Sequence, residues 1–314
     1  MMPPAYDGYF ADPFVLRLAD GSYVAYGGSG APAEGRRVFE ALSSPDLLAW
    51  TREGPVLDRL DPQVGDEYWA PEVAEADGAF WMYYSVGHGI DGHHIRVARA
   101  DTALGPFVDQ GVNLTPNETF AIDPHPFCDS NGQRYLFFAR DVLEPGRPGT
   151  HLAVALLGSM THLASEPRMA LEPNADWQIY QRERAMYGTI RDWHTLEGPS
   201  VLRRHGKYWL TYSGGAWTGA GYAVSWAEAA HPLGPWHHAP AGAPPLLHTT
   251  GNLIGPGHNS LTVTPHGEDV IAFHAWNRAR TARQMHLHHI AFRPDGPRVD
   301  GPIRGPSPYT EDPP

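Results

Sequence analysis

Several features that mark whole classes of proteins are scarce or missing in this sequence of 314 residues. Cys128 is the only cysteine, so the chain cannot form an internal disulfide, and a reducing compartment suits it. No apolar run approaches the roughly eighteen residues that a membrane-spanning helix needs. The first residues, MMPPAYDGYFADP, have neither a basic region nor an apolar core, so no secretory signal peptide is expected. These absences predict a cytoplasmic protein with no membrane partner.

Basic residues are also few: Lys and Arg total 23 against 35 Asp and Glu, which gives a formal net charge of −12. A nucleic-acid partner would require clustered Lys and Arg, and no such cluster occurs. A Walker A loop, an H-E-x-x-H motif and a G-x-S-x-G motif are all missing. Helical periodicity is almost absent, and only residues 176–186 are predicted to form a short helix. The sequence therefore favours an all-β fold.

The sequence does contain an internal repeat. Five segments align without a gap, each with a glycine nine positions after its first residue and an apolar or aromatic run after that glycine. Turn triplets such as ADG and SNG before these runs predict antiparallel hairpins. Hairpins repeated in units of roughly sixty residues predict a five-bladed β-propeller, with four-stranded antiparallel blades around a central channel. A chance likeness among the hairpins of a β-sandwich is the alternative, which the shared offset disfavours. The first residues of the five segments are Asp12, Trp69, Asp123, Glu197 and His258.

The five units occupy nearly the whole chain. The 34 Gly and 31 Pro residues are spread along it and are not pooled in a linker. The tail from Pro294 is too short for another domain. We therefore expect a single catalytic domain over residues 1–314, with no separate C-terminal domain.

The repeat brings acidic residues to equivalent places. The first strand of each propeller blade lines the central channel, so residues at one equivalent position face a common point. Asp12, Asp123 and Glu197 are then expected to converge, and their mutual repulsion should keep at least one of them protonated near neutral pH. One acid and one base are the groups needed to cleave a glycosidic bond. Each residue taken singly fits an ordinary turn, since Asp-Pro commonly opens one, and the shared register carries the prediction.

Two other first residues have a predicted role in binding. Trp69 is predicted to be a platform for a sugar ring, with a core residue as the alternative. His258 is either a hydrogen-bonding residue or a metal ligand. The remaining histidine clusters, such as His93-His94 and His286 with His288, are expected on the solvated surface, and Cys128 is expected to be a small buried residue.

Together these segments resemble glycoside hydrolase family 43. The resemblance runs in order from about residue 6 to 293 and reaches every unit. It implies a five-bladed propeller and an inverting enzyme that acts on arabinose- and xylose-containing glycans. The matching motifs are ADPFV at 11–15, WAPEV at 69–73, IDPHPF at 122–127, EGP at 197–199 with YWLTYS at 208–213, and GPGHNS at 255–260.

The resemblance also implies roles for single residues. Asp12 resembles the general base, Glu197 the general acid, and Asp123 the carboxylate that orients the acid and holds up its pKa. His258 resembles a channel histidine that in many members lies beside a calcium or other ion, so calcium is the expected cofactor. Arg283, in the segment RQMHL, resembles a basic residue near the sugar pocket and is expected to bind substrate.

The same resemblance narrows the range of expected substrates. Many β-xylosidases of the family carry a further C-terminal β-sandwich, for which this chain is too short, so an exo-acting α-L-arabinofuranosidase on oligosaccharides is expected. A β-xylosidase and an endo-α-1,5-arabinanase stay open. Retaining fructan-acting propellers usually have Asn before the first Asp-Pro, where this chain has Ala11. A non-catalytic carbohydrate-binding propeller is the alternative from another class, and three mutually repelling acids count against it. The sequence predicts no oligomeric state.

Overall fold

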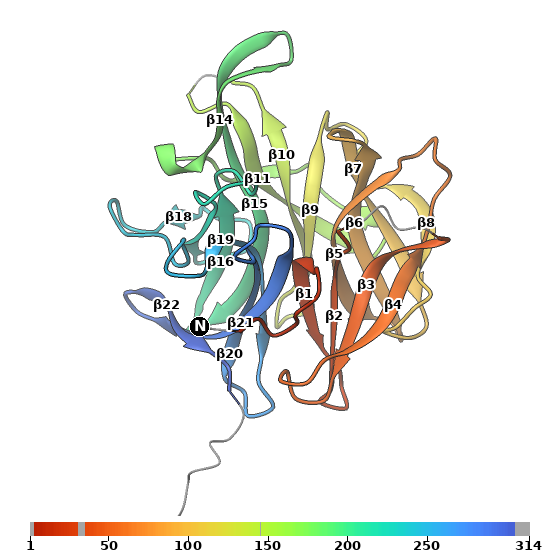
Figure 1. Ribbon diagram of the computed structural model, residues 1–314. Coiled ribbons are helices and arrows are strands. Elements are labelled where there is room, and N and C mark those ends of the chain that lie inside the picture. Colours follow the sequence, from red (N-terminus) through yellow and green to blue (C-terminus); the bar gives the residue numbers. More distant parts are fainter. Residues whose placement is uncertain (1–2, 31–34, 145, 305–314) are drawn as a thin grey trace, which may run out of the picture.

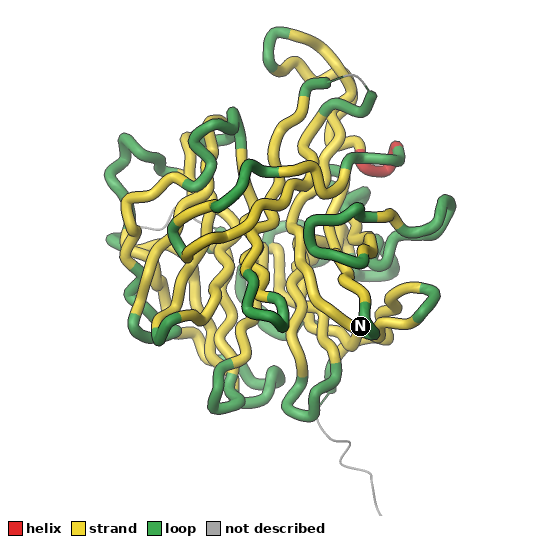
Figure 2. Tube along the Cα trace, turned by 180° about the vertical axis from the view of Figure 1, so that it is seen from behind, coloured by secondary structure: helices red, strands yellow, loops and turns green. Residues whose placement is uncertain are grey.

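The computed structural model describes residues 3–30, 35–144 and 146–304. Within these ranges the chain consists of β-strands and connecting loops, and its one helix is the short 3₁₀ turn η1 (Asp176–Gln178). Figures 1 and 2 show the strands from two opposite sides. None of the described residues belongs to a helix long and apolar enough to span a membrane. The all-β prediction is confirmed.

Three of the sheets contain four strands each, with the strands in chain order. All of their neighbouring strands are antiparallel. The first sheet comprises β1 (Ala11–Arg17), β2 (Tyr23–Gly28), β3 (Arg37–Ser44) and β4 (Thr51–Asp58). The second comprises β5 (Glu67–Ala76), β6 (Ala79–His88), β7 (Asp91–Ala100) and β8 (Val108–Asn113). The third comprises β19 (Ile254–Val263), β20 (Asp269–Trp276), β21 (Arg283–Arg293) and β22 (Gly296–Pro302).

The remaining ten strands form one continuous sheet made of two groups. A short parallel pairing joins the groups, Gly149 and Thr150 on β11 with His194 and Thr195 on β15. The first group comprises β9 (Ala121–Cys128), β10 (Arg134–Val142), β11 (Gly149–Ser159), β12 (His162–Leu163) and β13 (Arg168–Leu171). The second comprises β14 (Ile179–Met186), β15 (Thr189–Arg204), β16 (Lys207–Gly214), β17 (Ala223–Ala229) and β18 (His237–His238).

The strands that carry the repeated segments form a closed ring. Strand β1 packs against β5 and β19, β9 packs against β5 and β15, and β15 packs against β19. These five strands come from all parts of the chain, yet they meet around one centre. Residues far apart in the sequence can therefore share a site there.

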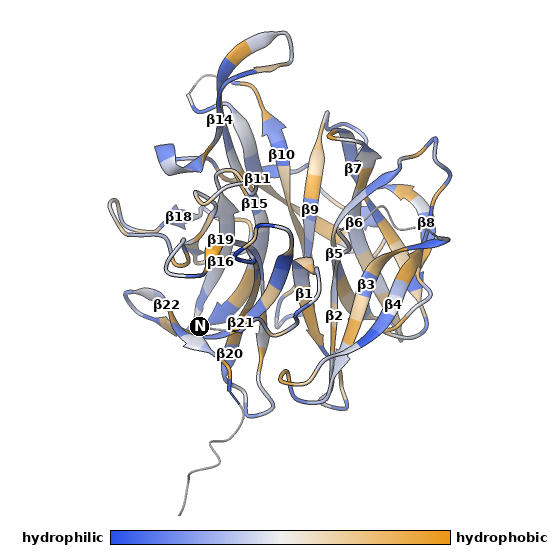
Figure 3. Cartoon of the chain, in the orientation of Figure 1, coloured by the Kyte–Doolittle hydropathy of each residue, from blue (hydrophilic) through white to orange (hydrophobic). Residues whose placement is uncertain are grey.

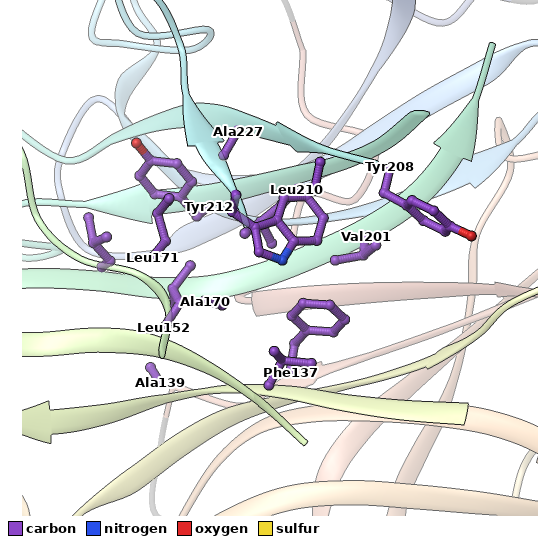
Figure 4. Close-up of a cluster of buried hydrophobic side chains, with 14 of the residues drawn as sticks. Phe137, Ala139, Leu152, Ala170, Leu171, Val201, Tyr208, Leu210, Tyr212 and Ala227 are labelled. Atoms are coloured by element: carbon purple, nitrogen blue, oxygen red, sulfur yellow. The ribbon is translucent and has the colours of Figure 1, made fainter. Parts of the chain in front are cut away.

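Buried apolar side chains fill the spaces between neighbouring groups of strands, in five separate clusters. On β10, Phe137 and Ala139 face β15–β17, whereas Leu136 and Phe138 face β5–β7. Because successive side chains of a strand point to opposite faces, a strand packed on both sides reads as a continuous apolar run. Figure 4 shows the cluster between β9–β11 and β15–β17, and Figure 3 shows hydrophobic residues along the strands.

Each strand of the ring is interrupted by the same β-bulge, at which two of its residues oppose one residue of the next strand. The first bulge residue has positive φ, a conformation that Gly adopts freely and that Asp and His tolerate better than most residues. Four of the five are followed by proline, which sheets accept at bulges. The Asp-Pro motifs are therefore bulges as well as sources of carboxylates. The five residues and their φ angles are Asp12 (52°), Ala70 (48°), Asp123 (58°), Gly198 (54°) and His258 (46°).

The structure corrects the predicted alignment in two of the five units. Trp69 and Glu197 lie one residue before their bulge, not on it. The cause is the turn that follows each strand. Asp77-Gly78 and His205-Gly206 make two-residue turns with positive φ at both positions, whereas the other three units have five-residue turns. Glycine is the last residue of the two-residue turns but the fourth residue of the five-residue turns, so the shared spacing to glycine misplaced the bulge by one residue.

Three smaller predictions are wrong. Residues 176–186 do not form one helix: only Asp176–Gln178 are helical, and Ile179–Met186 pair with β15 as strand β14. Pairing with a neighbouring strand outweighs the weak local preference of this segment for helix. Cys128 is exposed at the end of β9. His93 and His286 are buried, not solvated.

Candidate active site

The carboxylates predicted from the repeat meet at the centre of the ring. Asp12 on β1 and Asp123 on β9 flank His258 on β19: Asp12 Oδ1 lies 3.6 Å, and Asp123 Oδ2 3.7 Å, from His258 Nδ1. Glu197 on β15 completes the group, since one oxygen each of Asp123 and Glu197 and one ring nitrogen of His258 lie within 4.8 Å of one another. The Asp12 and Asp123 side chains are only 15% and 6% exposed.

The bulges are fixed by hydrogen bonds to the second strand of the preceding group. The N–H of Asp12 donates to His274 Nδ1 at 3.1 Å, and that of Asp123 donates to Ser85 Oγ at 3.0 Å. The N–H of Gly198 has no such side chain to reach and donates to Asp123 Oδ2 at 2.9 Å. This bond ties the Asp123 carboxylate to the residue next to Glu197.

Cationic and imidazole groups surround Asp12. Arg283 Nη1 and His274 Nδ1 each lie 3.2 Å from Asp12 Oδ1. Burial by itself raises the pKa of Asp12, but the Arg283 charge, together with His258 and His274, outweighs burial and lowers that pKa far below its usual range. Asp12 is therefore ionised at every pH at which the fold is expected to persist.

Arg283 is itself held by a set of aromatic residues. Its Nε and Nη2 donate to Tyr9 Oη at 3.1 and 2.9 Å. Its guanidinium carbon lies 4.6 Å from the ring centroid of Trp217 and 6.0 Å from that of Trp276. These contacts fix the guanidinium beside Asp12, where the sequence predicts a substrate-binding role for it.

Asp123 and Glu197 behave as a coupled pair. Burial, then the charges of Glu197 and Asp12, raise the pKa of Asp123 well above its usual range. Burial raises the pKa of Glu197 to about 7, with help from the Asp12 charge and against the hydrogen bond that Tyr222 donates to Glu197 Oε1 at 2.5 Å. Two carboxyl groups this close cannot both ionise easily, so the pair keeps a proton near neutral pH. The site thus offers one ionised carboxylate and one protonated acid.

His258 is buried and neutral. Its backbone N–H donates to Ser213 Oγ at 2.7 Å, and burial lowers the pKa of its ring, against the charge of Asp12. Asp123, Glu197 and His258 offer two carboxylates and one nitrogen to a metal ion. Calcium takes about six to eight oxygen ligands, so these residues fit it only if waters supply most of its shell. Both carboxylates are also needed for acid–base work.

Trp69 lies on β5, one residue before the bulge of that strand, and is partly buried. Its ring stacks on His93, with 3.6 Å between centroids and 18° between planes. His93 Nε2 in turn donates a hydrogen bond to Gly89 O, 3.0 Å away. One face of Trp69 is therefore backed by a fixed ring, which suits a platform, and its role in binding sugar stays a prediction.

The sequence did not identify Tyr222, His274 or Tyr9 as site residues. Tyr222 and Tyr9 lie outside the repeated segments and carry no motif. His274 had a usable signal, because it pairs with the residue before the bulge of β19 as Ser213 does on β15. Aligning the runs after each glycine, and not only the segments before it, would have revealed this second ring of positions.

A buried hydrogen-bonded pair joins β5 and β9, two neighbouring strands of the ring. His125 Nδ1 is 2.6 Å from Glu72 Oε2, and the N–H of Val201 donates to His125 Nε2 at 2.9 Å. Since Nε2 accepts a bond, the ring proton is on Nδ1 and faces the Glu72 carboxylate. The motif residues of WAPEV and IDPHPF thereby join β5, β9 and β15.

Comparison with known proteins identifies the family of the chain. The chain matches the family model described as glycosyl hydrolases family 43 over residues 3–297. It is 30% identical over 300 residues to the beta-D-galactofuranosidase xynD of Aspergillus niger, covering 89% of this chain and 78% of that protein. It is 31% identical over 284 residues to the extracellular exo-alpha-(1->5)-L-arabinofuranosidase of Streptomyces chartreusis, covering 84% and 79%. The structure of a thermostable family-43 glycoside hydrolase superposes with a TM-score of 0.81 at 29% identity over 95% of each chain. Other curated relatives are longer, and the chain spans 54% of their length.

Proposed function

Because the chain belongs to glycosyl hydrolase family 43 and is therefore a glycoside hydrolase, we propose that it is an inverting, exo-acting α-L-arabinofuranosidase that cleaves oligosaccharides. The observation that carries the proposal is the division of charge among three convergent carboxyl groups. The pKa of Asp12 is lowered, whereas that of Glu197 is raised to about 7. Groups whose environments push their pKa values apart in this way can act as base and acid in one reaction.

In the proposed reaction Asp12 is the general base and Glu197 the general acid. A water loses a proton to Asp12 as its oxygen bonds to the anomeric carbon. The bond from that carbon to the departing oxygen breaks, and Glu197 gives its proton to the departing oxygen. Asp123 keeps the proton on the acid until then. Attack and departure on opposite faces invert the anomeric configuration.

The choice of sugar is supported by the names of the relatives. One is named an arabinofuranosidase and another a galactofuranosidase, and both act on five-membered sugar rings by their names. An α-L-arabinofuranoside and a β-D-galactofuranoside share the configuration of their ring carbons, and the second has one more CHOH unit in its exocyclic chain. The β-xylosidase and endo-α-1,5-arabinanase alternatives correspond to more distant relatives.

Two measurements test the proposal. Purified protein is assayed on nitrophenyl α-L-arabinofuranoside, β-D-xyloside and β-D-galactofuranoside and on a linear arabinan. Highest kcat/KM on the arabinofuranoside is expected. No hydrolysis of any substrate would favour a binding protein. Proton NMR of the first product then gives the stereochemistry: an initial product of retained configuration would contradict a direct attack by water.

Three further proposals accompany this one. The architecture is a five-bladed propeller, in which β9–β13 and β15–β18 are the third and fourth blades; the closed ring of strands and the five clusters support it. Calcium, if it binds, is held near His258 largely through water. A cytoplasmic location is tested by cell fractionation, since two relatives are named extracellular.

A further inference from the structure

A β-hairpin not found in the other units rises from the strand that carries the acid. Strand β14 pairs with the first half of β15, and Figure 1 shows the hairpin projecting beyond the sheets. The register of the pair shifts after Ile179, which leaves Tyr180 in a bulge opposite His194 and Trp193. Tyr180 therefore lies beside the part of β15 that immediately precedes Glu197.

The strand pairing places Tyr180 near the acid, because its bulge lies opposite His194 and Glu197 follows on the same strand. Burial and the Glu197 carboxylate both raise the pKa of Tyr180, against the nearby cation Arg184. The Arg184 guanidinium carbon lies 5.0 Å from the ring centroid of Tyr180 and 5.5 Å from that of Trp193. The three side chains form one stack at the edge of the site.

The guanidinium of Arg184 contacts these two rings. Neighbouring arginines of the hairpin are paired: Arg182 binds Asp192 at 2.7 Å, and Arg191 donates to Leu143 O. For Arg184, no ion pair or hydrogen bond joins its guanidinium to any residue in the described part of the chain. Its N–H groups are therefore positioned by stacking and remain able to donate to a ligand.

The base of the hairpin is rigid. The buried Gln178 side chain accepts the N–H groups of Asn174 and Ala175 at 2.7 and 3.0 Å. Trp177 packs on Gly214, where an added Cβ would come within 2.9 Å of its ring. Gly214 follows Ser213, whose hydroxyl accepts the backbone N–H of His258. Strand β16 therefore contacts both the base of the hairpin and His258.

We propose that Tyr180 and Arg184 form the subsite for the sugar that leaves, with Tyr180 as its platform and Arg184 as a donor to its hydroxyls. This inference rests on the proposed hydrolytic function. The acid protonates the departing oxygen, so the departing sugar must lie against Glu197. An aromatic ring suits the apolar face of that sugar, and a guanidinium presents several donors to its hydroxyl groups.

Two substrates with the same reacting sugar separate this role from catalysis. An α-1,5-linked arabinobiose has a leaving sugar, whereas methyl α-L-arabinofuranoside does not, and both have leaving groups that need the acid. Tyr180→Ala should lower kcat/KM on the disaccharide by roughly three- to tenfold, in line with the strength of aromatic stacking, and change the methyl glycoside by less than about twofold. Arg184→Met, which keeps the apolar stem, should act in the same direction.

Arg182→Ala is the matched control on the same hairpin, and both substrates should keep their wild-type kcat/KM. Tyr180→Phe keeps the ring and should retain most of the cleavage of the disaccharide. Should Tyr180→Ala fail to fold, Arg184→Met decides the question. Equal losses on both substrates, or an equal loss in Arg182→Ala, would overturn the subsite. If the wild-type protein cleaves neither compound, the proposed function fails and not the subsite alone.

Discussion

Replacing Arg283 with methionine should bring the titration of Asp12 into the measurable pH range. Arg283 Nη1 lies 3.2 Å from Asp12 Oδ1, and unit charges at that distance attract by about 5 kcal/mol at an effective dielectric constant of roughly 20. One pKa unit corresponds to about 1.4 kcal/mol, so loss of the cation should raise the pKa of Asp12 by roughly two to four units. Only His258 and His274 would then counteract the effect of burial, which raises the pKa of Asp12.

The assay is the pH dependence of kcat/KM on an aryl arabinofuranoside, which reports the free enzyme. Asp12 must be ionised to accept a proton, so a higher pKa means that activity falls at a higher pH on acidification. The variant should show an acidic limb that the wild-type enzyme lacks, with activity recovering above it. Arg204→Met, which breaks a pair with Asp269 away from the site, is the control and should show no new limb.

A second readout is the stability of the fold. A carboxylate with a lowered pKa stabilises the folded state above its unfolded pKa, and this contribution is lost as the pH falls. The variant should therefore lose less stability between pH 7 and pH 3 than the wild-type protein does. A uniform loss of activity at every pH, with no new acidic limb, would refute the idea that Arg283 keeps Asp12 ionised.

The remaining predictions concern the acid, the base and the ion. Glu197→Gln should nearly abolish cleavage of oligosaccharides, by about 10²–10⁴-fold, and spare more activity on a dinitrophenyl glycoside, which needs little protonation, whereas Asp12→Asn should impair both; the opposite pattern would reverse the two roles. Asp123→Asn should lower the pKa of Glu197 from about 7 and shift the alkaline limb of kcat/KM to lower pH, because a neighbouring negative charge is lost; an unchanged limb would contradict the coupling. Gly257→Ala should reduce activity, because a Cβ there would overlap the Tyr222 ring that bonds Glu197, and a wild-type rate would show that this bond is dispensable. Chelation should lower activity or the melting temperature if calcium binds, and full activity with no metal by elemental analysis would leave His258 as a hydrogen-bonding residue only.

The repeat predicted which residues would meet, because equivalent strands of a ring face one centre whatever their distance in the sequence. It did not predict the register in every unit. Trp69 and Glu197 were aligned with the other three first residues, although they lie one residue before the bulge, because the spacing to glycine does not distinguish a two-residue turn from a longer one. The sequence pattern predicted the hairpins correctly. The strand pairing that determines the number of residues in each turn cannot be read from that pattern.

Groups outside the repeat escaped prediction for a different reason. Tyr222 reaches Glu197 from a loop, so this contact leaves no spacing in the sequence. His274 contacts Asp12 from a second strand, and its repeated position appears only when the runs after each glycine are aligned. The hairpin of β14 was misread as helix because its pairing with β15 depends on a partner strand and not on its own composition. Side chains that act through space, and strands that depend on a distant partner, need the folded structure.

The five bulges have a practical consequence for protein engineering. The fold determines the backbone conformation of each bulge, and the chemistry at that position depends on the side chain that it carries. Asp12, Asp123 and His258 place functional groups at three bulges, whereas Ala70 and Gly198 provide none at the other two. Ala70 already has a φ of 48°, which Asp or Asn tolerates well, so a new polar group could be installed there without rebuilding the backbone. The scaffold therefore has room for more chemistry than it uses.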